Sequence, residues 1–400
     1  MTIGKWARLL CVGAPMLAGC ANFWQVPGSS TTGGCTTNCT TANSGDFYIL
    51  NTGTTPQIIG ESIVTGVLTP ISGSPYSVTG TPTSMAIAPN GNFLCVSTSS
   101  GVFAYPIVGG VLGTVTQIST DVVSAIQIDR SSSWLVEAIP VTGSTSSTNG
   151  VQLEALLVNS TTGAYTGTGT PPSATFNSIA GAVVQQNQMV ISGDNDNIFV
   201  ALNAGGVIAV PFASAAPFPA GISATVIPVA HSGGFAVSVA VDPGQSPRLF
   251  YAGETLGNSA GTSGGLYVYN YSSLGSAGGL TQATGSPIAS GGLAPNFILP
   301  VASGTEVYVA DGGGNIYGFA VASTGTSTAP AYTISTGSTV AAGTQPIGMA
   351  QDSTGSFLLE LNSGGAPYLD TYTFDTTTTG KLDVQIVANT GASPIAIVAP

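Results

Sequence analysis

Apolar and polar positions along the chain follow one recurring unit of short strands separated by polar turns. The clearest copy has an apolar run at 82–88, a Pro-Asn-Gly turn at 89–91 and a second apolar run at 93–96. Another copy places apolar runs at 346–350 and 357–361 on either side of a Ser-Thr-Gly turn. No stretch shows the 3.6-residue period of an amphipathic helix, so the pattern predicts an all-β chain built from repeats.

Looser copies of the same unit start near Ser124, Gln188, Val237 and Pro295. Each has a turn of Asp, Gly, Ser, Pro or Asn in register with the two clear copies. Successive copies are roughly 42 to 64 residues apart, which is the range of four-stranded propeller blades with loop insertions. The stretch 140–235 is the least regular, so blade limits are hardest to place there.

The two ends of the repeat region each hold part of a unit. Residues 46–51 match a second strand without a first, and residues 393–398 match a first strand without the rest. Pairing of these segments would complete one blade and leave no open sheet edge. With the six internal copies, the sequence predicts a seven-bladed β-propeller over 46–400, closed by a C-terminal strand that completes the first blade.

Three segments carry further detail: GVLTPISGSPY at 66–76, GLT and GSP at 279–281 and 285–287, and AIAPNGNFL at 86–94. They resemble the repeats of lactonase-like seven-bladed propellers, the family typified by bacterial 6-phosphogluconolactonase. The resemblance implies that the first strand of each blade lines a central channel. It also implies that ligands enter from the face that carries the loops between blades and the loops after second strands. These motifs mark a fold and not an activity.

The composition of the chain excludes one class of function. Hydrophobic residues make up 43% of the chain, enough for a large core, while charged residues make up only 6%, against roughly 25% in ordinary soluble proteins. Five basic residues stand against seventeen acidic ones. Nucleic-acid binding needs clustered Lys and Arg to displace counterions from phosphates, so it is excluded.

The first residues resemble the export signal of bacterial lipoproteins. Lys5 and Arg8 precede an apolar run at 9–17 that is too short to span a membrane, and Leu-Ala-Gly-Cys ends at Cys20. We therefore expect a signal peptide over 1–19, acylation of Cys20 and a Thr/Gly-rich tether over 20–45. Ala21 favours the outer membrane or cell surface. The alternative is an ordinary signal peptide with an incidental Cys20.

The remaining cysteines predict no metal site. Cys35 and Cys39 lie in the tether, where an oxidising compartment permits a disulfide, and no second Cys or His pair lies nearby to complete a zinc site. Cys95 falls in an apolar strand and is expected to pack as a small hydrophobic side chain. The run Asp194–Asn197 lacks the Gly and distal Glu of a calcium loop and is expected to be a turn.

Few basic residues are expected near the channel, where the lactonase-like fold uses them. Once the signal is removed, Arg130, Arg248 and Lys381 remain, and the repeat register places all three in turns on the face away from the expected site. Enzymes of the lactonase-like fold resemble one another in using Arg and His near the channel. This sequence departs from that pattern, which disfavours phosphorylated substrates.

His231 is the single histidine and falls in a loop on the predicted ligand face, next to the blade that carries Glu254. A histidine base with an acidic neighbour could activate water toward a lactone carbonyl. The alternative is a loop histidine without a role. Ser232 follows His231, but the Gly-x-Ser-x-Gly elbow of serine hydrolases is absent.

Polar residues also recur where second strands end, at Asn51, Asn203, Asp311 and Asn362. They could ring the channel mouth and bind a sugar or a hydrated cation. Alternatively, their side chains form hydrogen bonds with the backbone groups of the turns.

Two functions follow. The first is a lipid-anchored, non-enzymatic binding or scaffold module facing the periplasm or cell surface. Its partners would be the membrane, through the lipid, and a neutral carbohydrate, a lactone or an envelope protein, with no cofactor and no nucleic acid. The second is a hydrolase of a non-phosphorylated lactone.

Overall fold

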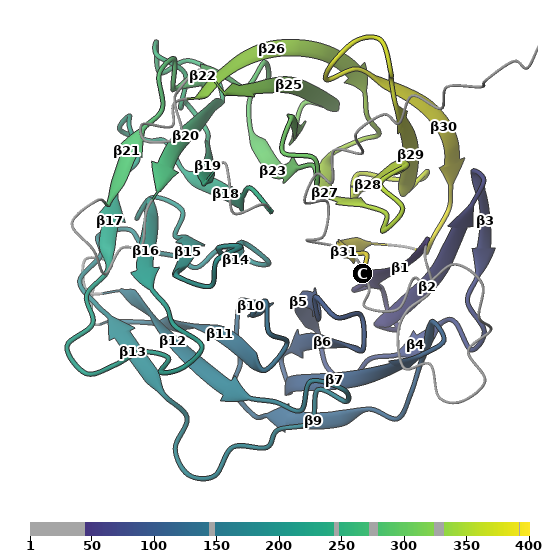
Figure 1. Ribbon diagram of the computed structural model, residues 1–400, viewed down its shortest axis with the longest axis vertical. Coiled ribbons are helices and arrows are strands. Elements are labelled where there is room, and N and C mark those ends of the chain that lie inside the picture. Colours follow the sequence, from purple (N-terminus) through teal and green to yellow (C-terminus); the bar gives the residue numbers. More distant parts are fainter. Residues whose placement is uncertain (1–44, 144–148, 244–247, 272–278, 324–331, 392) are drawn as a thin grey trace, which may run out of the picture.

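The computed structural model describes residues 45–143, 149–243, 248–271, 279–323, 332–391 and 393–400. These residues form seven antiparallel sheets of four or five strands, arranged in a ring around a central axis (Figure 1). All the described elements are strands, and no described helix is long and apolar enough to cross a membrane. The predicted all-β, seven-bladed propeller is confirmed.

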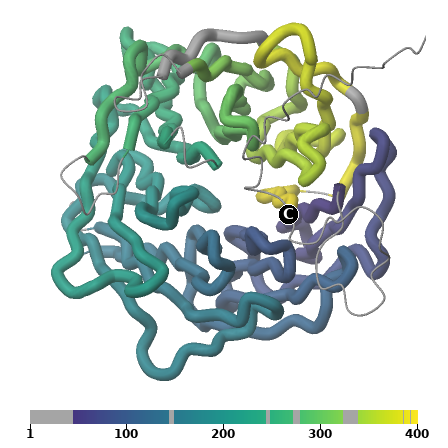
Figure 2. The backbone as a smooth tube through the Cα atoms, viewed as in Figure 1, coloured from purple at the N-terminus to yellow at the C-terminus, as the bar shows by residue number. Residues whose placement is uncertain are grey.

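The two ends of the chain complete one sheet, which we number blade 1. Strands from the axis outward, A to D, are β31 (Pro394–Val398), β1 (Asp46–Asn51), β2 (Gln57–Val64) and β3 (Val67–Pro70), with β4 (Tyr76–Ser77) beside β2. Ile49 of β1 lies opposite Ile397 of β31. The closure predicted from the two incomplete units is therefore present, and Figure 2 shows the C-terminal strand beside the axis.

The other six blades each follow the chain without interruption. Blade 2 holds β5 (Pro82–Ile87), β6 (Phe93–Thr98), β7 (Gly101–Val108), β8 (Val111–Leu112) and β9 (Thr116–Ser119). Blade 3 holds β10 (Ala125–Ile128), β11 (Trp134–Val141), β12 (Gly150–Leu157) and β13 (Ser173–Phe176). Blade 4 holds β14 (Met189–Ile191), β15 (Asn197–Ala201), β16 (Val207–Pro211) and β17 (Thr225–Ile227).

The second half of the ring repeats the arrangement. Blade 5 holds β18 (Ala236–Val241), β19 (Leu249–Glu254), β20 (Gly265–Tyr271), β21 (Leu280–Gln282) and β22 (Ile288–Ala289). Blade 6 holds β23 (Pro295–Pro300), β24 (Glu306–Asp311), β25 (Asn315–Ser323) and β26 (Tyr332–Ala341). Blade 7 holds β27 (Pro346–Gln351), β28 (Phe357–Asn362), β29 (Leu369–Phe374) and β30 (Leu382–Ala388).

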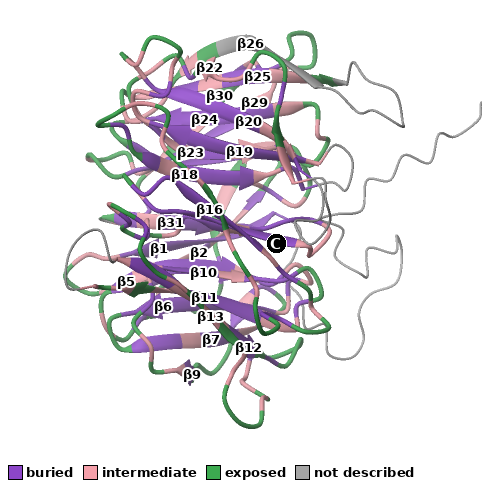
Figure 3. Ribbon diagram, turned by 90° about the vertical axis from the view of Figure 1, so that its left-hand side faces the viewer, coloured by how far each residue is buried: buried purple, intermediate pink, exposed green. Residues whose placement is uncertain are grey.

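The core lies between neighbouring blades. Strands β1, β6 and β19 are buried at every residue, because a blade covers each of their faces. Tyr48 of blade 1 and Leu94 of blade 2 belong to one apolar cluster, and Phe47 of blade 1 and Leu359 of blade 7 belong to another. Figure 3 shows the buried strands in the middle of the ring and the exposed loops at its two faces. This explains why B strands read as continuous apolar runs in the sequence.

The recurring turns have one conformation. In five blades the last residue of the A–B turn has a positive φ, and its N–H bonds the carbonyl three residues earlier. These residues are Gly91, Ser132, Asn195, Gly304 and Gly355. The left-handed region favours Gly and Asn, which accounts for the turn residues that marked the repeat in the sequence.

Candidate functional site

A cavity of about 640 Å³ runs along the propeller axis. Each blade contributes an apolar residue from the same position of its A strand to the wall: Met85, Ile126, Met189, Val239, Ile298, Met349 and Ile397. The amide side chains of Gln127, Gln188 and Gln351 interrupt this apolar lining. The volume falls in the range of small-molecule sites, whose few polar groups fix the orientation of a mainly apolar ligand.

Two side chains at the start of blade 4 bond residues of other blades. The Asn187 Oδ1 atom accepts a hydrogen bond from Ser84 Oγ of blade 2 at 2.8 Å, and Gln188 Oε1 accepts one from the backbone N–H of Val239 in blade 5 at 3.1 Å. The bond from blade 4 to blade 2 passes in front of blade 3. Both residues line the cavity near the start of the A strands, on the side of the loops between blades.

The opposite end of the cavity reaches the A–B turns. Residues of six turns line it there: Pro89, Arg130, Asn195, Pro243, Ser303 and Thr354. The resemblance to lactonase-like propellers implied a ligand face on the other side of the ring. The cavity also reaches the A–B turns of the opposite face, and the predicted ligand face stays a prediction.

The three cations lie where the repeat register predicted, but one of them adjoins the cavity. Arg130, in the A–B turn of blade 3, donates from Nη1 to the Gly193 carbonyl at 2.7 Å, and its backbone N–H bonds Asn195 Oδ1. Arg248 pairs with Asp194 at 3.2 Å. Arg130 differs from the other two cations because it also lines the axial cavity.

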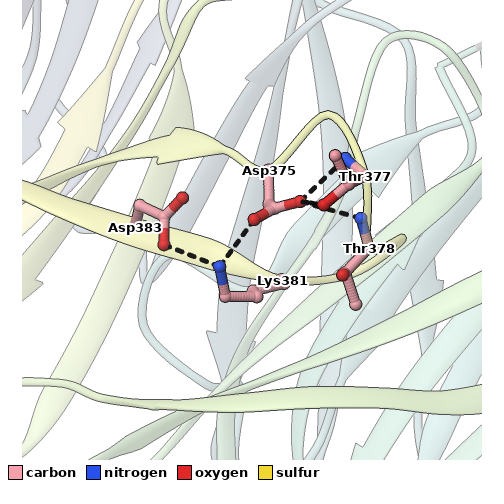
Figure 4. A network of polar contacts seen from close by, with 5 residues as sticks. All are labelled: Asp375, Thr377, Thr378, Lys381 and Asp383. Carbon is pink, nitrogen blue, oxygen red and sulfur yellow. Dashed lines mark hydrogen bonds and ion pairs between the residues drawn. The ribbon is translucent and has the colours of Figure 1, made fainter.

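Lys381 lies at the C–D turn of blade 7, between Asp375 and Asp383 (Figure 4). Its Nζ atom is 2.5 Å from Asp375 Oδ2 and 2.9 Å from Asp383 Oδ1. The Lys381 hydrogen bond holds the pKa of Asp375 well below its usual range, and bonds from the Thr377 hydroxyl and the Thr377 and Thr378 N–H groups add to this. The network stabilises an outer turn and leaves Lys381 engaged away from the axis.

The structure brings His231 and Glu254 together on the face that was predicted. Glu254 ends β19 with only 2% exposure, and its Oε2 atom accepts the N–H of Ala230 at 3.0 Å. Burial raises the pKa of Glu254, while the Ala230 bond and the charge of His231 lower it in part. His231 lies against Gly261, where a Cβ would come within 2.8 Å of the ring, and its Nδ1 atom is buried without a hydrogen-bond partner. Neither His231 nor Glu254 lines the axial cavity.

The polar residues at B-strand ends mostly hold loops. Asn51 Nδ2 donates to the Thr390 carbonyl, and the carboxylate of Asp311 accepts the N–H groups of Leu293, Ala294 and Gly313. The Asn203 carbonyl accepts the N–H of Ala236, and Asn362 bonds two acidic side chains. None of these four lines the cavity, so their proposed role in ligand binding stays a prediction.

Of the cysteine predictions, the structure tests the one for Cys95. Cys95 is fully buried in the apolar cluster of blades 2 and 3, where burial raises the pKa of its thiol. It packs as the small hydrophobic side chain that was expected. The lipidation site Cys20 and the tether cysteines Cys35 and Cys39 lie outside the described residues.

No protein-family model matches the chain, and no curated protein matches it at a significant level. Solved structures do match. A periplasmic gluconolactonase from Pseudomonas aeruginosa aligns over 88% of this chain and 98% of its own, with a TM-score of 0.63 and 15% identity. The fold is that of the lactonase-like propellers.

Two further solved structures support the same assignment of the fold. A candidate 6-phosphogluconolactonase from Bacteroides fragilis covers 88% of this chain and 97% of its own, with a TM-score of 0.60 and 13% identity. A protein of unknown function from Desulfotomaculum acetoxidans covers 89% and 100%, with the same TM-score and identity. At such identities the likeness carries the architecture of a lactonase-like propeller and not an activity.

Within this lactonase-like fold, two blades carry acidic pairs that sequence reasoning missed. In blade 3, Glu137 on the B strand lies directly opposite Glu154 on the C strand, and in blade 7 Glu360 lies opposite Asp370. Both pairs occupy the same repeat position, which is apolar in the other five blades. The five pairs there are Ile49 and Ile59, Val96 and Phe103, Val200 and Ile208, Ala252 and Tyr267, and Val309 and Tyr317.

Both glutamates are fully buried. Burial, followed by neighbouring acidic groups, raises the pKa of Glu137 to about 8 and that of Glu360 to about 8. In blade 7 the amide of Asn362 donates 3.0 Å hydrogen bonds to both Glu360 Oε2 and Asp370 Oδ2. In blade 3 the corresponding position holds Ile139, so this pair lacks a bridging amide. The repeat alignment, once the register is known, is the signal that reveals both pairs.

Proposed function

We propose that this chain is an envelope-facing binding propeller that takes a neutral, amphiphilic ligand into its axial cavity through the A–B turn face. The cavity itself carries the proposal, because its lining consists mainly of apolar A-strand residues from all seven blades, with a few amides. Such a lining suits an alkyl or acyl chain whose hydroxyl or amide groups meet Gln127, Gln188 and Gln351.

Location follows from two separate observations. The Pseudomonas aeruginosa gluconolactonase with the same fold is periplasmic, and the sequence before Cys20 resembles a lipoprotein signal. We propose an anchor at Cys20 with the propeller held outside the inner membrane. In that setting a protein with few charges would meet amphiphilic and uncharged envelope molecules.

Binding of octyl glucoside, a neutral glycoside with an alkyl chain, tests this proposal. Titration calorimetry below the micelle concentration should give saturable binding. A Gln127→Trp change places a large side chain in the cavity wall and should weaken binding by about tenfold or more, equivalent to about 1.4 kcal/mol. Gln282→Trp, on the exposed outer strand β21, is the matched control and should bind normally. Equal affinity in both variants would contradict the axial site.

Lactone hydrolysis is the second candidate, favoured by His231 Nδ1, which is buried beside Glu254 without a partner. His231 as general base could take a proton from water attacking a lactone carbonyl, with Glu254 orienting the imidazole. The absence of both residues from the cavity wall is the reason for ranking this function second.

Proton release from glucono-1,5-lactone and neutral acyl lactones decides between the two functions. If the chain is only a binding protein, the rate equals the uncatalysed rate. A catalysed rate that falls about 10²- to 10⁴-fold in His231→Ala, the usual contribution of a general base, would establish the hydrolase instead. Thr262→Ala is the control that leaves the imidazole in place, because Thr262 lies in the B–C loop of blade 5, next to the Gly261 that His231 contacts.

A further inference from the structure

The acidic pair of blade 3 has a third partner. Asp121 lies in the loop that connects β9 of blade 2 to β10 of blade 3, and it meets Glu137 and Glu154 at the junction of the two blades. One carboxylate oxygen from each of the three residues lies within 4.8 Å of the others. Three segments that are separate in sequence therefore converge on one point.

One oxygen of this cluster is buried without a partner. Glu137 is fully buried, and its Oε2 atom accepts a weak 3.4 Å bond from Ser119 Oγ. Its Oε1 atom has no hydrogen bond. An acceptor held away from water without a donor costs free energy, which a bound cation would offset.

No basic side chain of the described residues can supply that charge. Arg130 is bonded at the A–B turns, Arg248 pairs with Asp194, and Lys381 pairs with two aspartates of blade 7. In blade 7 the amide of Asn362 bonds Glu360 and Asp370, although Glu360 Oε1 also stays buried without a partner. Among the described residues, only the blade 3 pair is joined by a third carboxylate. In blade 3, Ile139 occupies the position of Asn362, and the side-chain hydrogen bond from Gln152 reaches Glu154.

We propose that Asp121, Glu137 and Glu154 bind a calcium ion at the junction of blades 2 and 3. The donors are all carboxylate oxygens, which suit hard cations such as Ca²⁺ and Mg²⁺ better than zinc or copper. Calcium accepts six to eight oxygen ligands in flexible geometry, whereas magnesium demands a regular octahedron. Glu154 and Asp121 are only partly buried, which leaves an entry path and room for water ligands. The bound ion would fasten the connecting loop of blade 2 to the sheet of blade 3, independently of any ligand in the axial cavity.

Titration calorimetry of the purified, EDTA-treated chain with CaCl₂ tests this site, together with its thermal unfolding midpoint. The wild-type chain should bind one ion per chain at this site, and calcium should raise its midpoint by about 2–4 °C. Glu137→Gln should abolish both effects. Glu360→Gln, at the same repeat position in blade 7, is the matched control and should keep them.

If Glu137→Gln fails to fold, Asp121→Asn replaces it, because this loop residue is partly exposed. Asp121→Asn should weaken calcium binding by about tenfold or more, since affinity follows the charge of the ligands. Calcium binding that survives in both blade 3 variants, an equal loss in Glu360→Gln, or no binding by the wild-type chain at millimolar calcium would each overturn the proposal. Magnesium binding with equal affinity would overturn the assignment to calcium.

Discussion

A chain that ends after residue 391 should not fold cooperatively. It lacks β31, the inner strand of blade 1, whose Ile397 packs with residues of blades 1 and 7 in one apolar cluster. Its removal opens the sheet at β1, exposes unpaired backbone groups and leaves two neighbouring blades without the strand between them. These losses together exceed the usual 5–15 kcal/mol of folding free energy. Circular dichroism during urea unfolding should show no sharp transition.

A single substitution in β31 measures how much the closing strand contributes to the free energy of unfolding, in a chain that still folds. Ile397→Ala should lower the free energy of unfolding by about 2–5 kcal/mol, because the side chain is 5% exposed and a cavity would remain. Val387→Ala, on the outer strand β30 with 54% exposure, should change it by less than about 0.5 kcal/mol. A truncated chain with the wild-type urea midpoint would show that the ring does not depend on this strand.

The fold was predictable because its determinants are local and repeated. The A–B turn needs a residue with positive φ, so Gly91, Asn195 and Gly355 recur at one position and mark the register of the blades that carry this turn. B strands are buried on both faces and therefore appear as uninterrupted apolar runs. Blade 1 was predictable from the two incomplete units of the repeat region, because each unit lacks the strands that the other supplies.

Of the candidate site, the repeat register predicts only the face of the propeller on which each residue lies. The register places His231 and Glu254 on one face, and the structure puts them side by side. Two residues of the cavity lining, Asn187 and Gln188, come from the least regular part of the repeat and bond Ser84 of blade 2 and Val239 of blade 5. No spacing rule relates those two residues to Ser84 and Val239, so these contacts could not be predicted from the sequence.

The two acidic pairs were missed for another reason. A lone Glu in an apolar strand resembles any other polar interruption until its cross-strand partner is known. Glu137 and Glu154 become a pair only through the β11–β12 register, and Asp121 joins them from another blade. Metal-binding motifs read from sequence rely on ligands in one segment, and here each ligand comes from its own segment.

The acidic pair of blade 7 should make the protein less stable in base. Burial and the neighbouring Asp370 raise the pKa of Glu360 to about 8, and burial raises the pKa of Asp370. The folded chain therefore holds protons that the unfolded chain releases near pH 4.5, the usual value for Glu. This contribution to stability is complete below about pH 4.5 and is lost as the pH rises through about 8.

Urea unfolding at pH 5, 7 and 9 in the presence of EDTA should reveal this dependence. For the wild-type chain, the free energy of unfolding should fall by roughly 2–5 kcal/mol per raised glutamate across this range. Glu360→Gln keeps the shape of the side chain without its charge, so it should be more stable than wild type at pH 9 and show a flatter profile. Glu137 has a similarly raised pKa, so combining Glu137→Gln with Glu360→Gln should flatten the profile further. A Glu360→Gln profile parallel to the wild type would mean that Glu360 is ionised in the folded chain, with its charge compensated by neighbouring groups.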